Sequence, residues 1–226
     1  MTLLAIVTLT IVSSTYYPFH IKCSSADLLP DHWGFSIWRT VFTPGSDSAF
    51  ARALDTINQW VKHECFTETN RAYVSADIQN HDYNAAREVW KRYHNDIIED
   101  RDLDNASPET VRQRFMAWIE SRGMEQNQTS RYRYCILIDA DVLETLSRFP
   151  TPPTRDLSAK WQLYSLKVID VEIDGEGDDE YPQGYRSCIM TPPWMLAHMY
   201  FYCHNVGADE MRGDYRGIPI YEMAEY

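Results

Sequence analysis

The stretch that decides the fold is residues 33–61, which read WGFSIWRTVFTPGSDSAFARALDTINQWV. Its first part is rich in aromatic and β-branched residues and predicts a strand over residues 35–42. Pro44 and Gly45 end this strand, because proline lacks the N–H of a ladder bond and glycine permits a turn. Apolar residues then recur at helical spacing from Phe50 to Val61. The stretch therefore predicts a strand, a turn and a helix that pack together.

The rest of the chain alternates polar connections with further strands and helices. Periodicity predicts helices at residues 83–98, 108–122, 140–148 and 194–202, and strands at residues 132–139, 161–173 and 185–191. Residues 67–81 are polar and show little periodicity. Because helices and strands fall in separate runs, we expect an α+β fold, specifically a ferredoxin-like antiparallel sheet of about four strands with a helical insertion.

Two of these segments carry a further structural expectation. In residues 161–173 the apolar positions are even-numbered up to Val168 and odd-numbered from Ile169, which predicts a bulge or break near Ile169. The 194–202 helix is apolar on every side, which is typical of a helix that is buried or lies at an interface.

Composition limits the classes of partner. The chain has 226 residues with 21 basic and 33 acidic side chains, a formal charge of −12. Such an acidic chain, without a basic stripe, is expected to bind nucleic acid poorly and to be repelled by anionic membrane surfaces, because both carry negative charge. Aromatic residues make up 13% of the chain, so large rings are expected to fill much of the core.

The N-terminus leaves the location of the protein open. Residues 3–12 are largely apolar, too few for a membrane span of about 20 residues, but suited to the apolar region of a signal peptide. No Lys or Arg precedes them, so an extra buried strand or a start codon placed too far upstream are the alternatives. We therefore treat residues 1–30 as a signal peptide or N-terminal extension, residues 31–226 as a single domain, and both secretion and a cytoplasmic location as open.

Cysteines and sequons depend on that choice. The five cysteines show no disulfide framework, and Cys135 and Cys188 are expected as small buried hydrophobic residues in strands. Asn105 and Asn127 each begin an N-x-S/T sequon and would be glycosylation sites if the chain is secreted.

Arg39 is the most informative single residue. It lies on the apolar face of the first predicted strand, where a guanidinium requires a partner. One interpretation is a cleft arginine that binds a carboxylate or phosphate of a ligand, with Asp139 as a second polar anchor. The alternative is an arginine near the strand end that pairs with Asp139 or Asp141, or that extends to solvent.

Motifs for metals and cofactors are missing from the sequence. Asp100, Asp102 and Asp104 match the start of a calcium loop, but Asn105 and Val111 stand where glycine and glutamate are needed. The acidic residues 174–180 fail the same test, and zinc would need more ligands than His198, Cys203 and His204. No nucleotide-binding or hydrolase motif is present, so we expect no metal and no cofactor.

Several motifs together resemble a known group of proteins. They are WGFSIWRT at residues 33–40, IIEDR at residues 97–101, FMAWIE at residues 115–120 and RYRYCILID at residues 131–139. Over residues 33–195 this set is similar to a group of uncharacterised proteins of filamentous fungi that has no assigned activity. The resemblance implies a fungal source and a role in specialised metabolism, and it transfers no catalytic residue. This chain differs from the group by some 30 residues before Trp33.

Two functional hypotheses follow. The first is a small-molecule binding protein or cofactor-independent enzyme, with a pocket between sheet and helices anchored by Arg39. The second is a non-catalytic interaction protein, secreted or cytosolic, that presents the apolar 194–202 helix to a partner. A pocket that encloses Arg39 favours the first hypothesis, and an exposed apolar face on residues 194–202 favours the second.

Overall fold

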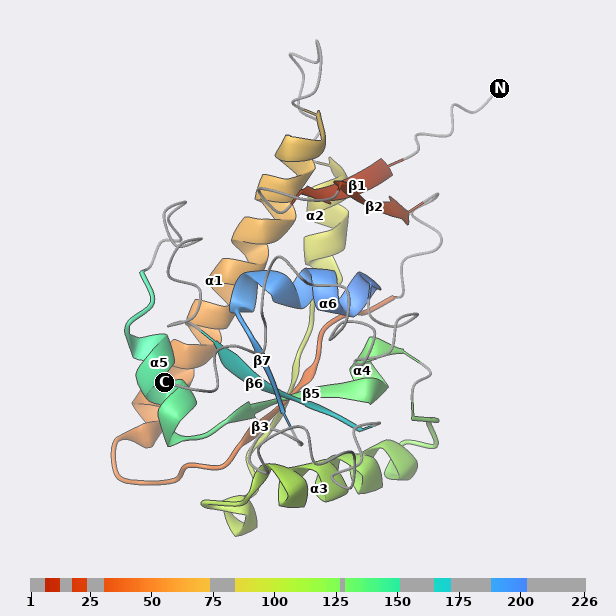
Figure 1. Cartoon of the computed structure of the whole chain (residues 1–226). Helices are drawn as coiled ribbons and strands as arrows, with labels where there is room; N and C mark the ends of the chain where they lie inside the picture. The colour runs from red at the N-terminus through yellow and green to blue at the C-terminus, as the bar shows by residue number, and fades with distance from the viewer. Residues whose placement is uncertain are drawn as a thin grey trace, which may run out of the picture.

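The structure is a computed structural model that describes residues 7–12, 18–23, 31–73, 84–126, 129–150, 165–171 and 188–202. A five-stranded sheet with the strand order β4-β3-β5-β6-β7 lies at its centre (Figure 1). Its strands are β3 (Ser36–Arg39), β4 (Asp96–Ile98), β5 (Tyr134–Ile138), β6 (Leu166–Asp170) and β7 (Ile189–Thr191). A separate antiparallel hairpin is formed by β1 (Val7–Val12) and β2 (Pro18–Cys23).

The sheet is mixed, with a parallel half and an antiparallel half. Strand β3 is parallel to both of its neighbours, so that Ile37 lies opposite Ile97 of β4 and Ile136 of β5. Strands β5, β6 and β7 pair antiparallel. The α+β class is confirmed, but the sheet has five strands instead of about four, and the ferredoxin-like arrangement is not confirmed.

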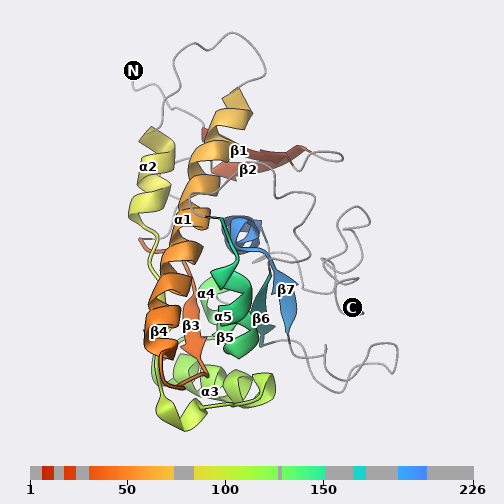
Figure 2. The same ribbon diagram turned by 90° about the vertical axis from the view of Figure 1, so that its left-hand side faces the viewer.

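Helices cover both faces of this sheet (Figure 2). Helices α1 (Ser46–Tyr73), α2 (Asn84–Lys91), α5 (Ala140–Ser147) and α6 (Leu196–Tyr202) belong to one face. Helix α3 (Pro108–Ser121) covers the other. The short helices η2 (Arg101–Leu103), α4 (Ser130–Arg133) and η6 (Pro193–Met195) lie in the connections. Among the described residues no helix is long and apolar enough to cross a membrane.

Two hydrophobic cores result, one on each face of the sheet. In β5, Tyr134, Ile136 and Ile138 contribute to the core under α1, whereas Cys135 and Leu137 contribute to the core under α3. A central strand that is buried on both faces reads as a continuous apolar run instead of an alternating one.

Strand β6 follows the same rule, and it corrects the prediction of a bulge. Its pairing with β5 continues without interruption through Ile169 and Asp170. Val168 packs in the core under α1 and Ile169 in the core under α3. The change of apolar phase therefore reflects two buried faces. The predicted bulge at Ile169 is wrong, and the strand ends one residue later, at Asp170.

Strand β4 lies where the sequence predicted the end of a helix. Helix α2 ends at Lys91, and residues 96–98 pair with β3. The backbones of Trp33 and His94 are joined by a hydrogen bond of 2.7 Å, and the amide of Phe35 donates to Asn95 Oδ1 at 2.9 Å. These contacts with a segment 60 residues away override the local helical periodicity. Helix α1 also continues to Tyr73, so part of the polar 67–81 passage is helical.

The helices predicted at residues 108–122 and 140–148 and the strand predicted at residues 132–139 are confirmed with small shifts at their ends. Of the strands predicted at residues 161–173 and 185–191, residues 166–170 and 189–191 are strand, and residues 161–164, 172–173 and 185–187 lie outside the described part of the chain. Helix α3 has Ser107 at its N-cap, where the side chain accepts from the amide of Thr110, and Pro108 follows at its first position. Helix α5 begins after Asp139, which caps it in the same way. Cys135 is buried in β5, as predicted. Cys188 is half-buried and directly precedes β7, so its predicted place as a buried residue within a strand is wrong.

Gly34 provides a test of the pairing between β3 and the segment before β4. Its φ is 134°, and a Cβ atom there would lie 2.3 Å from the carbonyl oxygen of His94. We expect Gly34→Ala to lower the free energy of unfolding by about 3 kcal/mol or more, because the methyl group meets backbone that cannot turn away. Urea unfolding followed by tryptophan fluorescence measures the loss.

Gly123→Ala is the matched control. Gly123 also has a positive φ, 66°, but no atom lies within 4 Å of an added Cβ. Its replacement should therefore cost about 1 kcal/mol, from the backbone conformation alone. Equal losses for the two variants would contradict the close approach at Gly34.

Candidate functional site

Arg39 lies where three elements meet at one edge of the sheet. It is the last residue of β3, and the chain then turns through residues 40–45 into α1. Glu99 directly follows β4, the parallel neighbour of β3. Because parallel strands end at the same edge, the carboxyl ends of β3 and β4 and the start of α1 lie together here.

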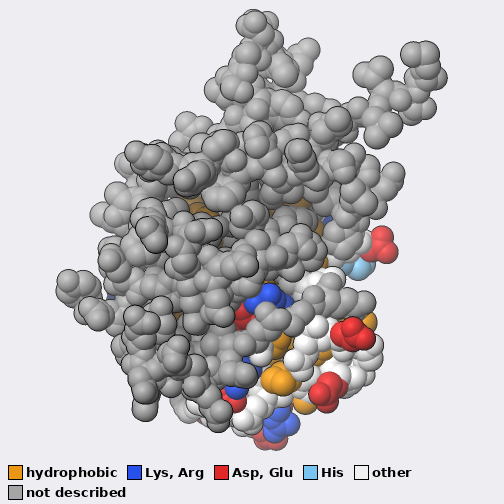
Figure 3. Space-filling view, turned by 45° about the vertical axis from the view of Figure 1, so that its right-hand side comes forward, with side chains coloured by type: hydrophobic (Ala, Val, Ile, Leu, Met, Phe, Trp, Pro, Cys, Tyr) orange, Lys and Arg blue, Asp and Glu red, His pale blue; other side chains and the backbone are white. Residues whose placement is uncertain are grey.

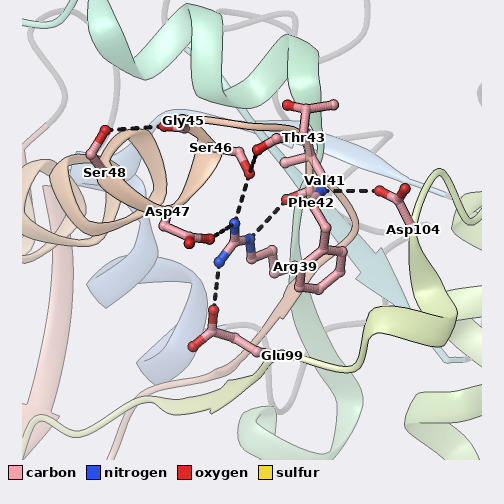
Figure 4. A network of polar contacts seen from close by, with 10 residues as sticks. All are labelled: Arg39, Val41, Phe42, Thr43, Gly45, Ser46, Asp47, Ser48, Glu99 and Asp104. Carbon is pink, nitrogen blue, oxygen red and sulfur yellow. Dashed lines mark hydrogen bonds and ion pairs between the residues drawn. The ribbon is translucent and has the colours of Figure 1, made fainter.

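The guanidinium of Arg39 is bound from several sides (Figure 4). Nε donates to the carbonyl of Val41 at 2.8 Å, and Nη1 donates to Glu99 Oε1 at 2.6 Å. Nη2 donates both to Ser46 Oγ at 2.8 Å and to Asp47 Oδ1 at 2.5 Å. We call Arg39, Ser46, Asp47 and Glu99 the Arg39 clasp. These bonds account for four of the five N–H groups of a guanidinium.

Two aromatic rings complete the surroundings of this charge. The guanidinium carbon lies 4.6 Å from the centre of the Phe42 ring and 4.9 Å from that of Phe50. Both distances suit a cation–π contact. Arg39 is only 3% exposed, and the rings and carboxylates together offset the loss of its hydration.

The pKa values in the clasp follow from this arrangement. Burial alone would lower the pKa of Arg39, but the hydrogen bonds and charges of Asp47 and Glu99 outweigh it and raise the pKa. The hydrogen bond and the charge of Arg39 lower the pKa of Asp47 below its ordinary value. At neutral pH the clasp therefore holds one cation and an ionised Asp47.

A hollow of about 460 Å³ lies beside the clasp. Its lining combines apolar side chains with charges of both signs: Arg39, Phe42, Asp47, Phe50, Ala51, Leu54, Glu99 and Arg101. The guanidinium carbon of Arg101 lies 5.6 Å from the centre of the Phe42 ring. We call this the Arg39 hollow. The first functional hypothesis expected a pocket at Arg39, and this hollow lies beside that residue.

Asp139 follows β5 at the same edge of the sheet, but it has structural partners. Its Oδ1 accepts from the amide of Val142 at the start of α5, and its Oδ2 accepts from Lys167 Nζ at 2.5 Å. Lys167 also donates to Asp141 at 3.0 Å. Burial would lower the pKa of Lys167, but these two carboxylates raise it, so the lysine is a protonated cross-link between β6 and α5. The alternative interpretation expected Arg39 to pair with Asp139 or Asp141 or to extend to solvent. Both expectations are wrong, because Arg39 is buried and pairs with Asp47 and Glu99.

The remaining predicted sites are placed as follows. Asn105 is exposed with a positive φ of 57°, Ser107 of the same sequon caps α3, and Asn127 lies outside the described residues. Within the acidic run, Asp100 caps η2 and Asp104 accepts from the amide of Phe42. In the described part of the chain no three His, Cys, Asp or Glu side chains form a group suited to a metal. Residues 174–180, 203 and 204 and the side chain of residue 198 lie outside it.

The sequence pointed to Arg39 but not to its partners. Asp47 is eight residues away, and Glu99 is 60 residues away, just after a segment that was predicted to be the end of a helix. The requirement for a partner was visible in the sequence, since a buried guanidinium is usually paired, but it does not indicate which carboxylates supply it. Comparisons of the chain with protein-family models, curated proteins and solved structures found no match.

The pKa of Asp47 tests the clasp directly. We expect Arg39→Met to raise this pKa to near its ordinary value of 3.8, because the hydrogen bond and charge that lower it are removed. A lowered pKa stabilises the fold above the ordinary value, and the contribution is lost as the pH falls through the folded-state pKa. NMR titration of the side-chain carboxyl carbon measures the shift.

Glu109 is the internal control for this titration. Its pKa is also lowered, mainly by a hydrogen bond from Arg112, whose Nε lies 2.8 Å from Oε2. This pair belongs to α3, on the opposite face of the sheet from α1, and should titrate identically in both proteins. A low Asp47 pKa that persists in Arg39→Met would contradict the clasp.

Proposed function

We propose that this chain binds a small organic molecule in the Arg39 hollow, as a binding protein or cofactor-independent enzyme. The observation that carries the proposal is the hollow itself, a space of about 460 Å³ where aromatic rings and fixed charges converge. Small-molecule sites in proteins typically have volumes of about 300–1,000 Å³ and combine an apolar wall with a few placed polar groups. A fungal source and a role in specialised metabolism remain predictions from the sequence.

The position of the hollow in the sheet supports the proposal. From β3 the chain passes through α1 to β4 on one side, and then through α3 to β5 on the other side of β3. The two connections cover opposite faces of the sheet. In open sheets with parallel strands, ligands bind outside the carboxyl ends of the strands near the point where connections diverge. The Arg39 hollow lies at these carboxyl ends.

The chemistry of the lining favours binding over acid–base catalysis. A general base is most effective when its pKa lies near the working pH. The pKa of Asp47 is lowered by Arg39, which makes this carboxylate a stable charge and a weak base. A fixed charge of this kind orients a ligand, whereas it accepts a proton poorly.

The described side chains of α6 do not form the exposed apolar face that the interaction hypothesis required. The side chains of Leu196, Ala197, Met199 and Tyr200 in α6 are buried. Tyr200 packs against Trp33 and Phe35, with ring centres 5.5 and 5.7 Å apart. The described side chains of α6 therefore belong to the core, while Trp194 and Met195 before it are half-buried, and we favour ligand binding.

Filling the hollow tests the proposal. Ala51 is exposed on α1 and lines the hollow, so Ala51→Trp should occupy the space without disturbing the core. A fragment library is screened against the wild-type protein by ligand-observed NMR. We expect fragments that bind to the wild-type protein to lose at least tenfold in affinity for Ala51→Trp, because the indole excludes them sterically.

Ala117→Trp is the matched control. Ala117 is exposed on α3, and Figure 3 shows the described surface around this helix as a mixture of charged and apolar side chains. This variant should bind the same fragments as the wild-type protein. Fragments that bind all three proteins equally, or the lack of any binding fragment, would overturn the proposal.

A further inference from the structure

The guanidinium of Arg39 is not available as an anchor for an anionic ligand. Four of its five N–H groups donate to Val41, Ser46, Asp47 and Glu99. Capture of a carboxylate or phosphate in bidentate geometry needs two parallel N–H groups, and only one is left. Two carboxylates also neutralise its charge. Other groups of the hollow must therefore select the ligand.

The carboxylates of the clasp still have acceptor capacity toward the hollow. Asp47 gives Arg39 its Oδ1 and Glu99 gives Arg39 its Oε1. Within the described residues Asp47 Oδ2 and Glu99 Oε2 accept no hydrogen bond, and the two side chains are 80% and 49% exposed. Each carboxylate is thus held in place by one oxygen and can accept an N–H donor with the other.

The charges around the hollow favour a cation. In the lining itself Asp47 and Glu99 balance Arg39 and Arg101. Asp104 binds the amide of Phe42, and Asp100 and Asp102 lie in the same short segment after Glu99, so residues 39–47 and 99–104 together hold five carboxylates and two guanidiniums. This is a local excess of three negative charges. The guanidinium of Arg101 is exposed and donates no hydrogen bond within the described residues, so it is the group of the lining that would attract an anion. The surrounding carboxylates oppose such binding, because like charges repel over about 10 Å at moderate ionic strength.

The aromatic walls have the same preference. Phe42 and Phe50 already hold the Arg39 cation, with ring centres 4.6 and 4.9 Å from its guanidinium carbon. The face of an aromatic ring attracts cations and repels anions. Ala51 and Leu54 extend this wall with an apolar surface.

We infer that the ligand of the Arg39 hollow is a small organic cation, an ammonium group attached to an apolar or aromatic portion. The ammonium donates to the free oxygens of Asp47 and Glu99, and the apolar portion packs against Phe50 and Leu54. This inference rests on the proposed function, and it adds the charge and the shape of the ligand.

Three probes of similar size and different charge test the inference: 2-phenylethylammonium, 2-phenylethanol and 3-phenylpropionate. Each is titrated into the wild-type protein by protein-observed NMR at low salt. We expect the ammonium compound to bind about three- to tenfold more tightly than the alcohol, and the carboxylate to bind most weakly. Salt at 1 M should reduce the preference for the ammonium compound, because it screens exposed charges.

Charge variants separate a local contact from the overall charge of the protein. Glu99→Gln and Asp47→Asn should each remove most of the preference for the ammonium compound over the alcohol. Glu120→Gln changes the same charge on an exposed residue of α3 and should leave the preference unchanged. Circular dichroism confirms that each variant is folded before it is titrated.

The outcomes distinguish the inference from the proposed function. Tighter binding of the alcohol or the carboxylate, blocked by Ala51→Trp, overturns the cation inference but leaves a ligand site in the hollow. A preference for the ammonium compound that Glu120→Gln reduces as much as Glu99→Gln overturns it as well, since overall charge then explains the result. If none of the three probes binds, the inference is wrong, and the fragment screen decides the proposed function separately.

Discussion

The buried guanidinium of Arg39 is the constraint on which this edge of the structure depends. An unpaired charge in that position would be strongly destabilising, so its partners must be brought to it. Asp47 comes from the first turn of α1 and Glu99 from the residue after β4. By binding both, Arg39 fixes the start of a 28-residue helix and the end of a three-residue strand against the end of β3. The short β4 has few ladder bonds of its own and benefits most from this.

The same interaction decides what the edge can recognise. An arginine at the carboxyl end of a parallel strand suggests an anion site, but here the protein itself satisfies the guanidinium. The groups left toward the hollow are the outer oxygens of two carboxylates and the exposed part of the half-buried Phe42 ring. A carboxylate that is already held by Arg39 through one oxygen loses less side-chain entropy when a ligand binds to its other oxygen. The clasp thus stabilises this edge of the sheet and also preorganises part of the lining of the hollow.

Much of the fold could be predicted from local patterns, and the remainder depends on contacts between distant segments. The strand, turn and helix at residues 36–61 and the capped helix α3 follow from periodicity and capping chemistry. Strand β4 could not be predicted, because three residues carry no usable period and Asn95 and Gly34 establish the pairing across 60 residues. For the site, the requirement of Arg39 for a partner was predictable. The identity of Glu99 was not, since it depends on that missed strand.

The guanidinium N–H signals of Arg39 provide the most direct test of this account. In a ¹⁵N-labelled protein, hydrogen exchange at Nε of Arg39 is compared with that of Arg101, which is exposed on the rim of the hollow. The clasp predicts slow exchange for Arg39, with separate Nη signals because rotation of the group is restricted, and fast exchange for Arg101. Exchange of Arg39 as fast as that of Arg101 would show a guanidinium open to solvent and would contradict the clasp.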